Sequence, residues 1–523
     1  MPRKALRAFA AVLLLAPLCL HAEEPVDLSM VTRIRDEGLR RSQVVETAAY
    51  LSDVIGPRLT GSPQMKEANE WTRKRLEEWG LANAHLEGWE FGRGWSYDRV
   101  AVHMVKPQKT PLFSLPKAWT PGTKGPVRGL AVRAEIEEEK DFEAWRGKLA
   151  GKIVLRDFER DLSGVAEPEP RRFSAAALTE LRGIEISTEP EEDELAVALR
   201  RYRRHRAVNE FLAAEGALAS LEVSNRSWGV IRVGRGGSRF ADETPGVPTL
   251  MMAAEPYNRL VRLLDRGVEV ELEIDLQAAF HDNDSKSYNT LAEIPGTDKK
   301  DEVVLVGAHL DSWHGATGAT DNAAGCAVVM EAVRILKALG VAPRRTIRVA
   351  LWSGEEQGLL GANAHVTEHL ATRPVPQDAT EKKVDPFLWK GPLTRKPGYD
   401  KLTAYFNLDG GAGRIRGIFA EGNAAVAPIF EAWLAPFHDL GADTVTLRPT
   451  YNTDHEVFDR IGLPGFQFIQ DELDYGPRTH HSSQDTFDHL DKQDLMQASV
   501  VMASFLYHAA MRPEPLPRKP LRD

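Results

Sequence analysis

The sequence predicts an α/β fold in which a largely parallel sheet is covered by helices on both faces. Strand-like apolar runs alternate with helical patterns in the C-terminal half of the chain, and the run at residues 303–308 is apolar throughout. Such a strand is buried on both faces, as is typical of parallel sheets between two helical layers. With 523 residues, of which 42% are hydrophobic, the chain can form a large core and more than one domain.

The N-terminal residues form a distinct segment. Basic residues precede a short apolar run at residues 8–20, and acidic residues follow it. The run is shorter than the roughly 20 residues that a membrane-spanning helix needs, so residues 1–22 are predicted to be a secretory signal peptide. We therefore expect a secreted or periplasmic protein without stable membrane association. Removal of the signal peptide would take away Cys19 and leave Cys326 as the single cysteine, so no intramolecular disulfide is expected.

The charge of the chain limits its partners. A formal net charge of -10 at pH 7 argues against nucleic acid or an anionic membrane as a partner. The basic run at residues 200–206 is a local exception, but it follows an acidic stretch and leads into a helical pattern. That context is more typical of a solvated helix face than of a polyanion site.

Composition and periodicity divide the mature chain into a main domain that is split by an insert. Residues 23–126 begin with helical patterns, continue with two strand-like runs and end in a stretch rich in Pro, Gly and Lys. Residues 127–276 form the insert, residues 277–512 the larger part of the main domain, and residues 513–523 a tail. Within the insert, the charged segment at residues 158–194 is predicted to be a mobile loop.

Three apolar strands of the main domain lead directly to acidic or imidazole side chains. The strands are predicted at residues 303–308, 346–352 and 404–408, with a helix at residues 325–340 between the first two. The side chains at their ends are His309, Asp311, Glu355, Glu356 and Asp409. Because open α/β sheets place their sites at the carboxyl ends of the strands, we expect these side chains to lie together.

Two further residues, Asp321 and His481, complete the set of side chains that a two-zinc hydrolase needs. Asp321 follows a glycine-rich loop that can bend its carboxylate into the site, where its oxygens would bridge two cations about 3.5 to 4 Å apart. Of the adjacent pair Glu355 and Glu356, one would coordinate metal and the other would act as general base. Asp311 would orient the imidazole of the preceding strand by accepting its second N–H.

Taken singly, these residues have ordinary structural explanations, because an isolated His-x-Asp is more often structural and adjacent glutamates are usually solvated. Longer motifs surround them, however, at residues 309–313, 318–325, 351–358 and 481–486. These motifs resemble the co-catalytic zinc peptidases of the aminopeptidase Y and glutamate carboxypeptidase family, and in particular its carboxypeptidase Q branch. The resemblance extends to residues 55–62 and to residues 287–289.

The resemblance implies a three-layer α/β/α zinc-exopeptidase fold with a mixed central sheet and an inserted, protease-associated-like α+β domain. It also implies two Zn²⁺ per chain. One zinc would be bound by His309, Asp321 and Asp409, and the other by Asp321, Glu356 and His481. Glu355 would be the general base, and the peptide bond between Asp321 and Asn322 would be cis.

The resemblance also selects between two adjacent histidines. His481 is chosen over His480 because three residues separate the ligand of the family from an Asp-Thr pair, and that pair is here Asp485-Thr486. Residues Tyr451 and Asp454 stand where relatives carry a loop near the substrate, so they are candidate substrate contacts.

The sequence therefore predicts a zinc-dependent exopeptidase that hydrolyses short peptides or dipeptides, with a peptide substrate as partner and a homodimer as a possible assembly. An aminopeptidase would use the same metals, so the direction of cleavage stays open. A receptor-like member that has lost catalysis is less favoured because all five ligands and the base are present. A glutaminyl-cyclase-like acyltransferase is less favoured because of the insert and the complete two-metal set.

Overall fold

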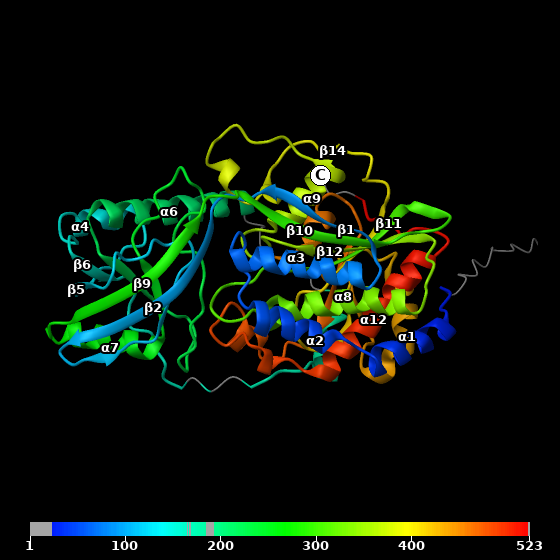
Figure 1. Ribbon diagram of the computed structural model, residues 1–523, viewed down its shortest axis with the longest axis horizontal. Helices are drawn as coiled ribbons and strands as arrows, with labels where there is room; N and C mark the ends of the chain where they lie inside the picture. The colour runs from blue at the N-terminus through cyan, green and yellow to red at the C-terminus, as the bar shows by residue number, and fades with distance from the viewer. Residues whose placement is uncertain (1–23, 165, 167–168, 185–192, 521–523) are drawn as a thin grey trace, which may run out of the picture.

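The computed structural model describes residues 24–164, 166, 169–184 and 193–520 and consists of two lobes, each built on an eight-stranded sheet (Figure 1). The signal peptide predicted at residues 1–22 lies outside the described residues. Over the described part of the chain, no helix combines the length and the apolar character that crossing a membrane requires.

The main sheet is mixed, with four parallel strands at its centre. Its order is β1 (Ala82–Glu90), β10 (Lys286–Ile294), β12 (Arg345–Trp352), β11 (Lys299–His309), β15 (Leu402–Asn407), β18 (Gly465–Gln470), β16 (Ile415–Phe419) and β17 (Thr444–Thr446). Strands β12, β11, β15 and β18 are parallel neighbours, whereas β10 and β16 pair antiparallel with the outer members of this group. The mixed sheet agrees with the predicted fold class.

Helices cover both faces of this sheet. One face carries α1 (Leu28–Arg40), α2 (Val44–Ala49), α3 (Pro63–Glu78), α8 (Ala324–Ala338), α10 (Ala427–Leu434) and α12 (Lys492–Met511), and the other carries α9 (Leu360–His369) and α11 (His455–Asp459). The buried strand β11 shows why two layers are needed, because its alternate residues face opposite ways. Val304 and Val306 pack in the core of the first face, and Leu305 packs in the core of the second. The three-layer prediction is confirmed.

The second lobe has its own sheet and its own core. Its order is β3 (Thr110–Pro111), β2 (Gly94–Lys106), β9 (Glu271–His281), β5 (Val127–Arg133), β6 (Lys152–Leu155), β7 (Ala219–Val223), β8 (Thr249–Met252) and β4 (Ser114–Pro116). The helices α4 (Phe142–Trp145), α6 (Glu194–Ala214) and α7 (Ala254–Asp265) belong to this lobe (Figure 1). Its likeness to a protease-associated domain stays a prediction.

The second sheet begins at Gly94, well before residue 127, where the sequence placed the start of the insert. Strand β2 pairs along its length with β9, so residues from both sides of the predicted insert build one ladder. The Pro- and Gly-rich stretch that indicated a linker instead contributes β3 and β4 and buries Trp119 completely. Turn residues mark this stretch in the sequence, but the long-range pairing of β2 does not show there.

The sequence predicted a mobile loop at the charged segment 158–194. In the structure, the described part of this segment is partly helical and contacts the main lobe. It contains α5 (Ala175–Leu181). Just before this helix, Arg172 forms ion pairs with Asp494 at 2.5 Å and with Asp471 at 3.1 Å, and both carboxylates are buried in the main lobe. The basic run at residues 200–206 lies in α6, as predicted.

Candidate metal centre

Three neighbouring strands bring predicted side chains to one edge of the main sheet. Strand β11 ends at His309, Glu355 and Glu356 follow β12, and Asp409 follows β15. Because β12, β11 and β15 are parallel neighbours, their carboxyl ends meet. Nε2 of His309 lies 3.3 Å from Oδ1 of Asp409. The structure therefore brings together side chains that are up to 100 residues apart in the chain.

Asp321 lies between two groups of side chains in the turn η3 (Ala319–Ala323), and its peptide bond to the next residue is cis, as the resemblance implies. Its Oδ1 is 3.2 Å from Nε2 of His309, and its Oδ2 is 3.4 Å from Nε2 of His481. The same nitrogen of His481 lies 2.8 Å from Oε2 of Glu356. One carboxylate thus faces both histidines, which is the position that a bridging ligand needs.

The imidazole of His309 presents an acceptor nitrogen to the site. Its Nδ1 donates to the backbone carbonyl of Asp311 at 3.0 Å, so in the neutral ring Nε2 carries a lone pair toward the carboxylates of Asp321 and Asp409. Burial lowers the pKa of His309, but the charges of Asp409 and Glu355 raise that pKa well above its usual value. The carboxylates therefore favour a positive charge on or beside this imidazole.

Two carboxylate oxygens of the proposed metal ligands are buried without a hydrogen-bond donor in the described part of the chain. They are Oδ2 of Asp321 and Oε1 of Glu356. An unpaired buried carboxylate oxygen is costly, and coordination to a metal removes the cost. Imidazole nitrogens and carboxylate oxygens in this number match the donors of a zinc-type divalent cation.

Glu355 is buried beside these side chains, with 9% of its surface exposed. Burial raises the pKa of Glu355, and the negative charges of Asp409, Glu356 and Asp454 raise it further, against the opposing charge of His309. A carboxylate with a raised pKa, placed next to metal ligands, is suited to accept and return a proton near neutral pH.

Asp311 has different partners from those that the sequence predicted. Its carboxylate is 3.7 Å from Nδ1 of His309, which instead donates to the backbone carbonyl of Asp311. The carboxylate accepts hydrogen bonds from Thr60 Oγ1 at 2.9 Å and from the backbone N–H groups of Glu355 at 3.2 Å and Glu356 at 3.3 Å. Asp311 therefore orients the glutamate pair as well as the imidazole, because the turn after β12 passes directly over it.

Three residues that support the site were missed as such by sequence reasoning. The buried guanidinium of Arg58 donates to the carbonyls of Leu310 at 2.8 Å and Gly318 at 2.7 Å, and so joins the end of β11 to the loop before Asp321. Asp485 accepts from the backbone N–H of Thr320 at 2.6 Å and holds the same loop. Burial and the charge of Asp321 raise the pKa of Asp485 to about 7. Both residues lie in the motifs that carried the resemblance, but neither role can be read from a motif alone.

The third residue is Tyr475, which begins the turn η7 (Tyr475–Thr479). Burial raises the pKa of this phenol well above its usual value, and the carboxylates of Asp321 and Asp409 add to the effect. The hydroxyl therefore keeps its proton and is a hydrogen-bond donor at the site. Tyr475 lies outside the motifs that carry the resemblance, so the sequence gives no signal for its position at the site.

The two candidate substrate contacts differ in their surroundings. Asp454 is fully buried and lies close enough to His309, Asp311 and Asp409 for their charges to act on its pKa. Tyr451 has 58% of its surface exposed. The role of both residues as substrate contacts stays a prediction, and Tyr451 is the more accessible of the two.

The second lobe reaches the candidate metal centre through a loop between β7 and β8. Arg232 pairs with Ser482, and the backbone N–H of Val233 donates to the carbonyl of His481 at 2.8 Å. Nη2 of Arg232 lies 3.2 Å from Nδ1 of His481. Burial lowers the pKa of Arg226, and the positive charge of the nearby Arg232 lowers it further. Neither arginine has a carboxylate partner among the described residues, so positive charge from this lobe faces the site.

The adjacent histidines have distinct positions. The ring of His480 lies 4.8 Å from that of Tyr475, whereas Nε2 of His481 points at Asp321 and Glu356. A cation group that includes both histidines with Asp321 is possible by distance. The contact with Glu356 favours His481, in line with the choice made from the sequence.

Fold, strand-end side chains and known proteins agree on the class of this protein. Residues 289–506 match the model of Peptidase family M28. The protein is a metallopeptidase. The match to the M28 model agrees with the resemblance that the motifs indicated.

Curated relatives cover most of the chain. Carboxypeptidase Q of Bos taurus is 28% identical over 482 residues, which is 92% of this chain and 88% of the relative, and that of Homo sapiens is 26% identical with the same coverage. Aminopeptidase YwaD of Bacillus subtilis (strain 168) is 25% identical over 221 residues, 42% of this chain and 43% of the relative.

Solved structures share the fold. The Peptidase M28 precursor of Shewanella amazonensis SB2B has a TM-score of 0.66 at 24% identity and covers 94% of this chain and 98% of its own. BSAP, a zinc aminopeptidase from Bacillus subtilis, has a TM-score of 0.56 at 19% identity and covers 90% and 95%. Both matches extend over the two lobes together.

Proposed function

We propose that this protein is an exopeptidase of short peptides or dipeptides that uses two zinc ions, and that it acts after export to a periplasm or the extracellular medium. The observation that carries the proposal is the position of Asp321, whose two oxygens face two separate histidines at 3.2 and 3.4 Å. The similarity to a zinc aminopeptidase and to carboxypeptidase Q supports the choice of metal and of reaction.

The proposed ligands fall into two sets that share Asp321. His309 and Asp409 complete one set, and Glu356 and His481 complete the other. When bound, zinc makes a water acidic and polarises a peptide carbonyl. Asp311 and Arg58 act on this chemistry only through position, because they hold the backbone of the ligand loops.

Glu355 is the proposed general base. Its carboxylate accepts a proton from the attacking water and then returns it to the nitrogen of the leaving amine. Its raised pKa suits both transfers, since the group must accept and release a proton near neutral pH. We propose that the hydroxyl of Tyr475, whose raised pKa keeps it protonated, donates a hydrogen bond to the oxygen of the carbonyl under attack.

The arginines of the second lobe favour a substrate with a free carboxylate beside the metals. In the structure, Nδ1 of His481 accepts from Arg232. Once Nε2 of His481 binds a metal, the ring proton must sit on Nδ1, which then no longer accepts from the guanidinium. Arg232 is thereby released to pair with an anion, and the terminal carboxylate of a short peptide is the anion that a peptidase substrate supplies. This supports carboxypeptidase or dipeptidase action.

The second candidate is an aminopeptidase, which the similarity to YwaD and BSAP favours. Three substrates separate the two directions: a dipeptide, its N-acetyl form and its C-terminal amide. The carboxypeptidase proposal expects the amide to be the poor substrate. Loss of cleavage on acetylation alone would show that the enzyme recognises the free amine.

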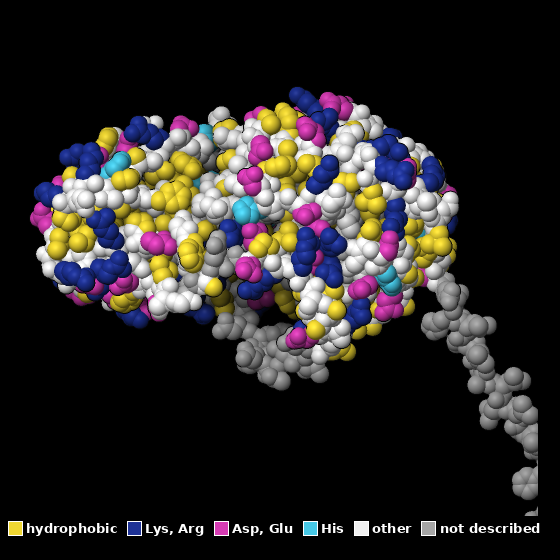
Figure 2. Space-filling view, turned by 90° about the horizontal axis from the view of Figure 1, so that it is seen from below, with side chains coloured by type: hydrophobic (Ala, Val, Ile, Leu, Met, Phe, Trp, Pro, Cys, Tyr) yellow, Lys and Arg dark blue, Asp and Glu magenta, His cyan; other side chains and the backbone are white. Residues whose placement is uncertain are grey.

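Metal content tests the class of protein before any substrate is known. Two zinc equivalents at the candidate centre are expected for the peptidase, one for a cyclase-like enzyme and none for a receptor-like protein. Nucleic acid is not a proposed partner, and on the face shown in Figure 2 basic and acidic side chains are interspersed over both lobes. A homodimer is proposed as an assembly, and sedimentation analysis tests it.

A further inference from the structure

A second cluster of metal-binding side chains lies between β1 and α9, separate from the candidate metal centre. His365 and His369 stand one turn apart on α9, and Glu87 comes from β1. The potential ligand atoms of the three residues lie within 4.8 Å of one another. We propose that Glu87, His365 and His369 bind a divalent transition metal ion, and that zinc is the ion their chemistry fits best.

The donors and their spacing support zinc. Histidines four residues apart share one face of a helix, and two imidazoles with one carboxylate are a common three-residue zinc set that leaves a position for water. Bonds of about 2.0 to 2.1 Å in a tetrahedral site separate donor atoms by roughly 3.3 Å. Nδ1 of His365 is 3.0 Å from Oε2 of Glu87, close to that value, and Nε2 of His369 is 2.6 Å from Oε1. The second pair must open, which His369 permits because its side chain is 45% exposed at the end of the helix.

The protonation of these groups is compatible with metal binding. Burial raises the pKa of Glu87, but hydrogen bonds from His365 and His369 outweigh burial and hold that pKa far below its usual value. Burial also lowers the pKa of His365. At neutral pH the carboxylate is therefore ionised and the buried imidazole neutral, which are the forms that coordinate metal.

A second layer of contacts holds the carboxylate in place. Nδ2 of Asn289 donates to Oε2 of Glu87 at 3.2 Å and to the carbonyl of Gly361 at 3.0 Å. Groups that orient a ligand in this way are a regular feature of metal sites. A pair of histidines that met a glutamate only at the surface would lack such support.

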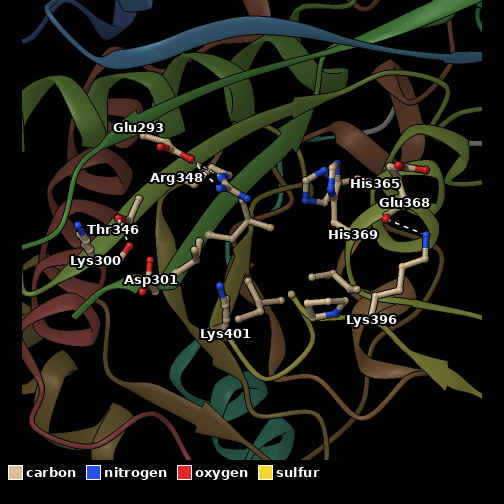
Figure 3. A pocket seen from close by; sticks show the side chains of 16 residues that line it. Glu293, Lys300, Asp301, Thr346, Arg348, His365, Glu368, His369, Lys396 and Lys401 are labelled. Atoms are coloured by element: carbon tan, nitrogen blue, oxygen red, sulfur yellow. Dashed lines mark hydrogen bonds and ion pairs between the residues drawn. The ribbon is translucent and has the colours of Figure 1, made fainter.

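Two of the three residues, His365 and His369, line a cavity of about 480 Å³, which gives a metal ion and its water a path of entry. Figure 3 shows His365 and His369 side by side in the wall of this cavity. Four basic side chains, Arg348, Lys300, Lys396 and Lys401, line the same cavity together with three acidic ones, Glu293, Asp301 and Glu368. Glu293 offsets the charge of Arg348 at 2.6 Å. The local charge therefore does not exclude a divalent ion.

The proposed ion would join α9 to β1 close to the turn that carries the general base. Asn289, which holds Glu87, also accepts from the backbone N–H of Ser353 at 3.2 Å, two residues before Glu355. A metal at this cluster would fix the C-terminal end of α9, whereas the N-terminal end of this helix comes shortly after Glu355 and Glu356 in the chain. Its expected effect is on stability, because none of its ligands touches the candidate metal centre.

Zinc content provides the test. Four holoenzymes are compared: the parent, the variants His369→Ala and Glu87→Gln, and the control variant His438→Ala. Each is equilibrated at a series of free zinc concentrations, and bound zinc per chain is measured by mass spectrometry. His438 is an exposed histidine outside the cluster. The parent and H438A are expected to bind one zinc more than H369A and E87Q, and a chelator should lower the melting temperature of the parent by more than it lowers that of H369A.

The difference in bound zinc between the parent and the variants does not depend on how many ions the candidate metal centre holds. The proposed function and the proposed second metal site can therefore fail independently of each other. H369A and E87Q should retain peptidase turnover, whereas Asp321→Asn should lose turnover and keep the extra zinc. Equal zinc in parent, H369A and E87Q at every concentration that saturates turnover would overturn the proposal and leave a hydrogen-bonded triad. Loss of zinc in H369A but not in E87Q would also overturn it, because adventitious binding to a surface histidine does not need the carboxylate.

Discussion

Replacing Glu355 by glutamine removes a proton acceptor and changes little else. The side chain is 9% exposed and glutamine has the same size, so the substitution creates no cavity. It also removes one negative charge from a group in which Glu356 and Asp409 already raise the pKa of Glu355. Less repulsion among buried carboxylates means that metal-free E355Q should melt at the same temperature as the metal-free parent or at a higher one.

The effect on turnover is expected to be large. A positioned general base contributes about 10² to 10⁴ in rate, so the barrier should rise by roughly 3 to 5 kcal/mol. The loss should appear in kcat, with little change in KM, because the proton transfer belongs to the transition state and not to substrate binding.

The neighbouring glutamate provides a matched control. Glu356→Gln makes the same chemical change one residue away, but at a proposed ligand whose Oε2 lies 2.8 Å from Nε2 of His481. We expect E356Q to lose zinc and E355Q to keep it, when both are assayed for metal content and for hydrolysis of one dipeptide. Turnover of E355Q within tenfold of the parent at full zinc content would refute the assignment of the base. Loss of zinc by E355Q to the same extent as E356Q would do so as well.

Further predictions concern the bridging ligand, the substrate clamp and an ion pair of the second lobe. Asp321→Asn should weaken zinc binding at both positions by at least about 100-fold, whereas Asp409→Asn should affect one, as metal titration of each variant will show. Arg232→Ala should raise KM about 10- to 100-fold for peptides with a free carboxylate and leave C-terminal amides unchanged, and an equal effect on both would contradict the clamp. Burial raises the pKa of Glu222, but Lys117 and Arg156 lower it to about 2 from 4.5. The resulting stability of about 3 kcal/mol is therefore present above pH 4.5 and is lost as the pH falls toward 2. Denaturant unfolding between pH 7 and pH 3 should show this slope in the parent and a smaller one in Glu222→Gln.

Sequence reasoning located the site because its main signals are local. An apolar strand such as β11 can be recognised from a few residues, and parallel strands place their carboxyl ends at one edge whatever the loops between them do. His309, Glu355, Glu356 and Asp409 were predicted to lie together on that argument alone. The bridging role of Asp321 was inferred from the glycine-rich loop that precedes it. The choice of His481 over His480 needed the longer motifs, because neither histidine directly follows a strand of the parallel group.

What the sequence did not predict depends on long-range contacts. Strand β2 was assigned to the main domain because its partner, β9, lies more than 150 residues away in the chain. The burial of Asp454 depends on the direction in which α11 leaves the sheet, and the contacts of Asp311 depend on how the turn after β12 passes over it. None of these arrangements has a period or a turn signature, so a single sequence carries no signal for them.

The second lobe is part of the candidate metal centre and not only a border of the cleft. His481 has a φ of +58°, a left-handed conformation that is uncommon for residues other than glycine, and it persists only where surrounding contacts enforce it. Those contacts come largely from the loop of the second lobe, through Val233 to the carbonyl of His481 and through Ile231, which exchanges two hydrogen bonds with Ser483. Removal of the lobe would therefore release a proposed zinc ligand and also remove the arginines that we propose bind the substrate. A change in specificity after such a deletion cannot be assigned to substrate contacts unless zinc content is shown to be intact.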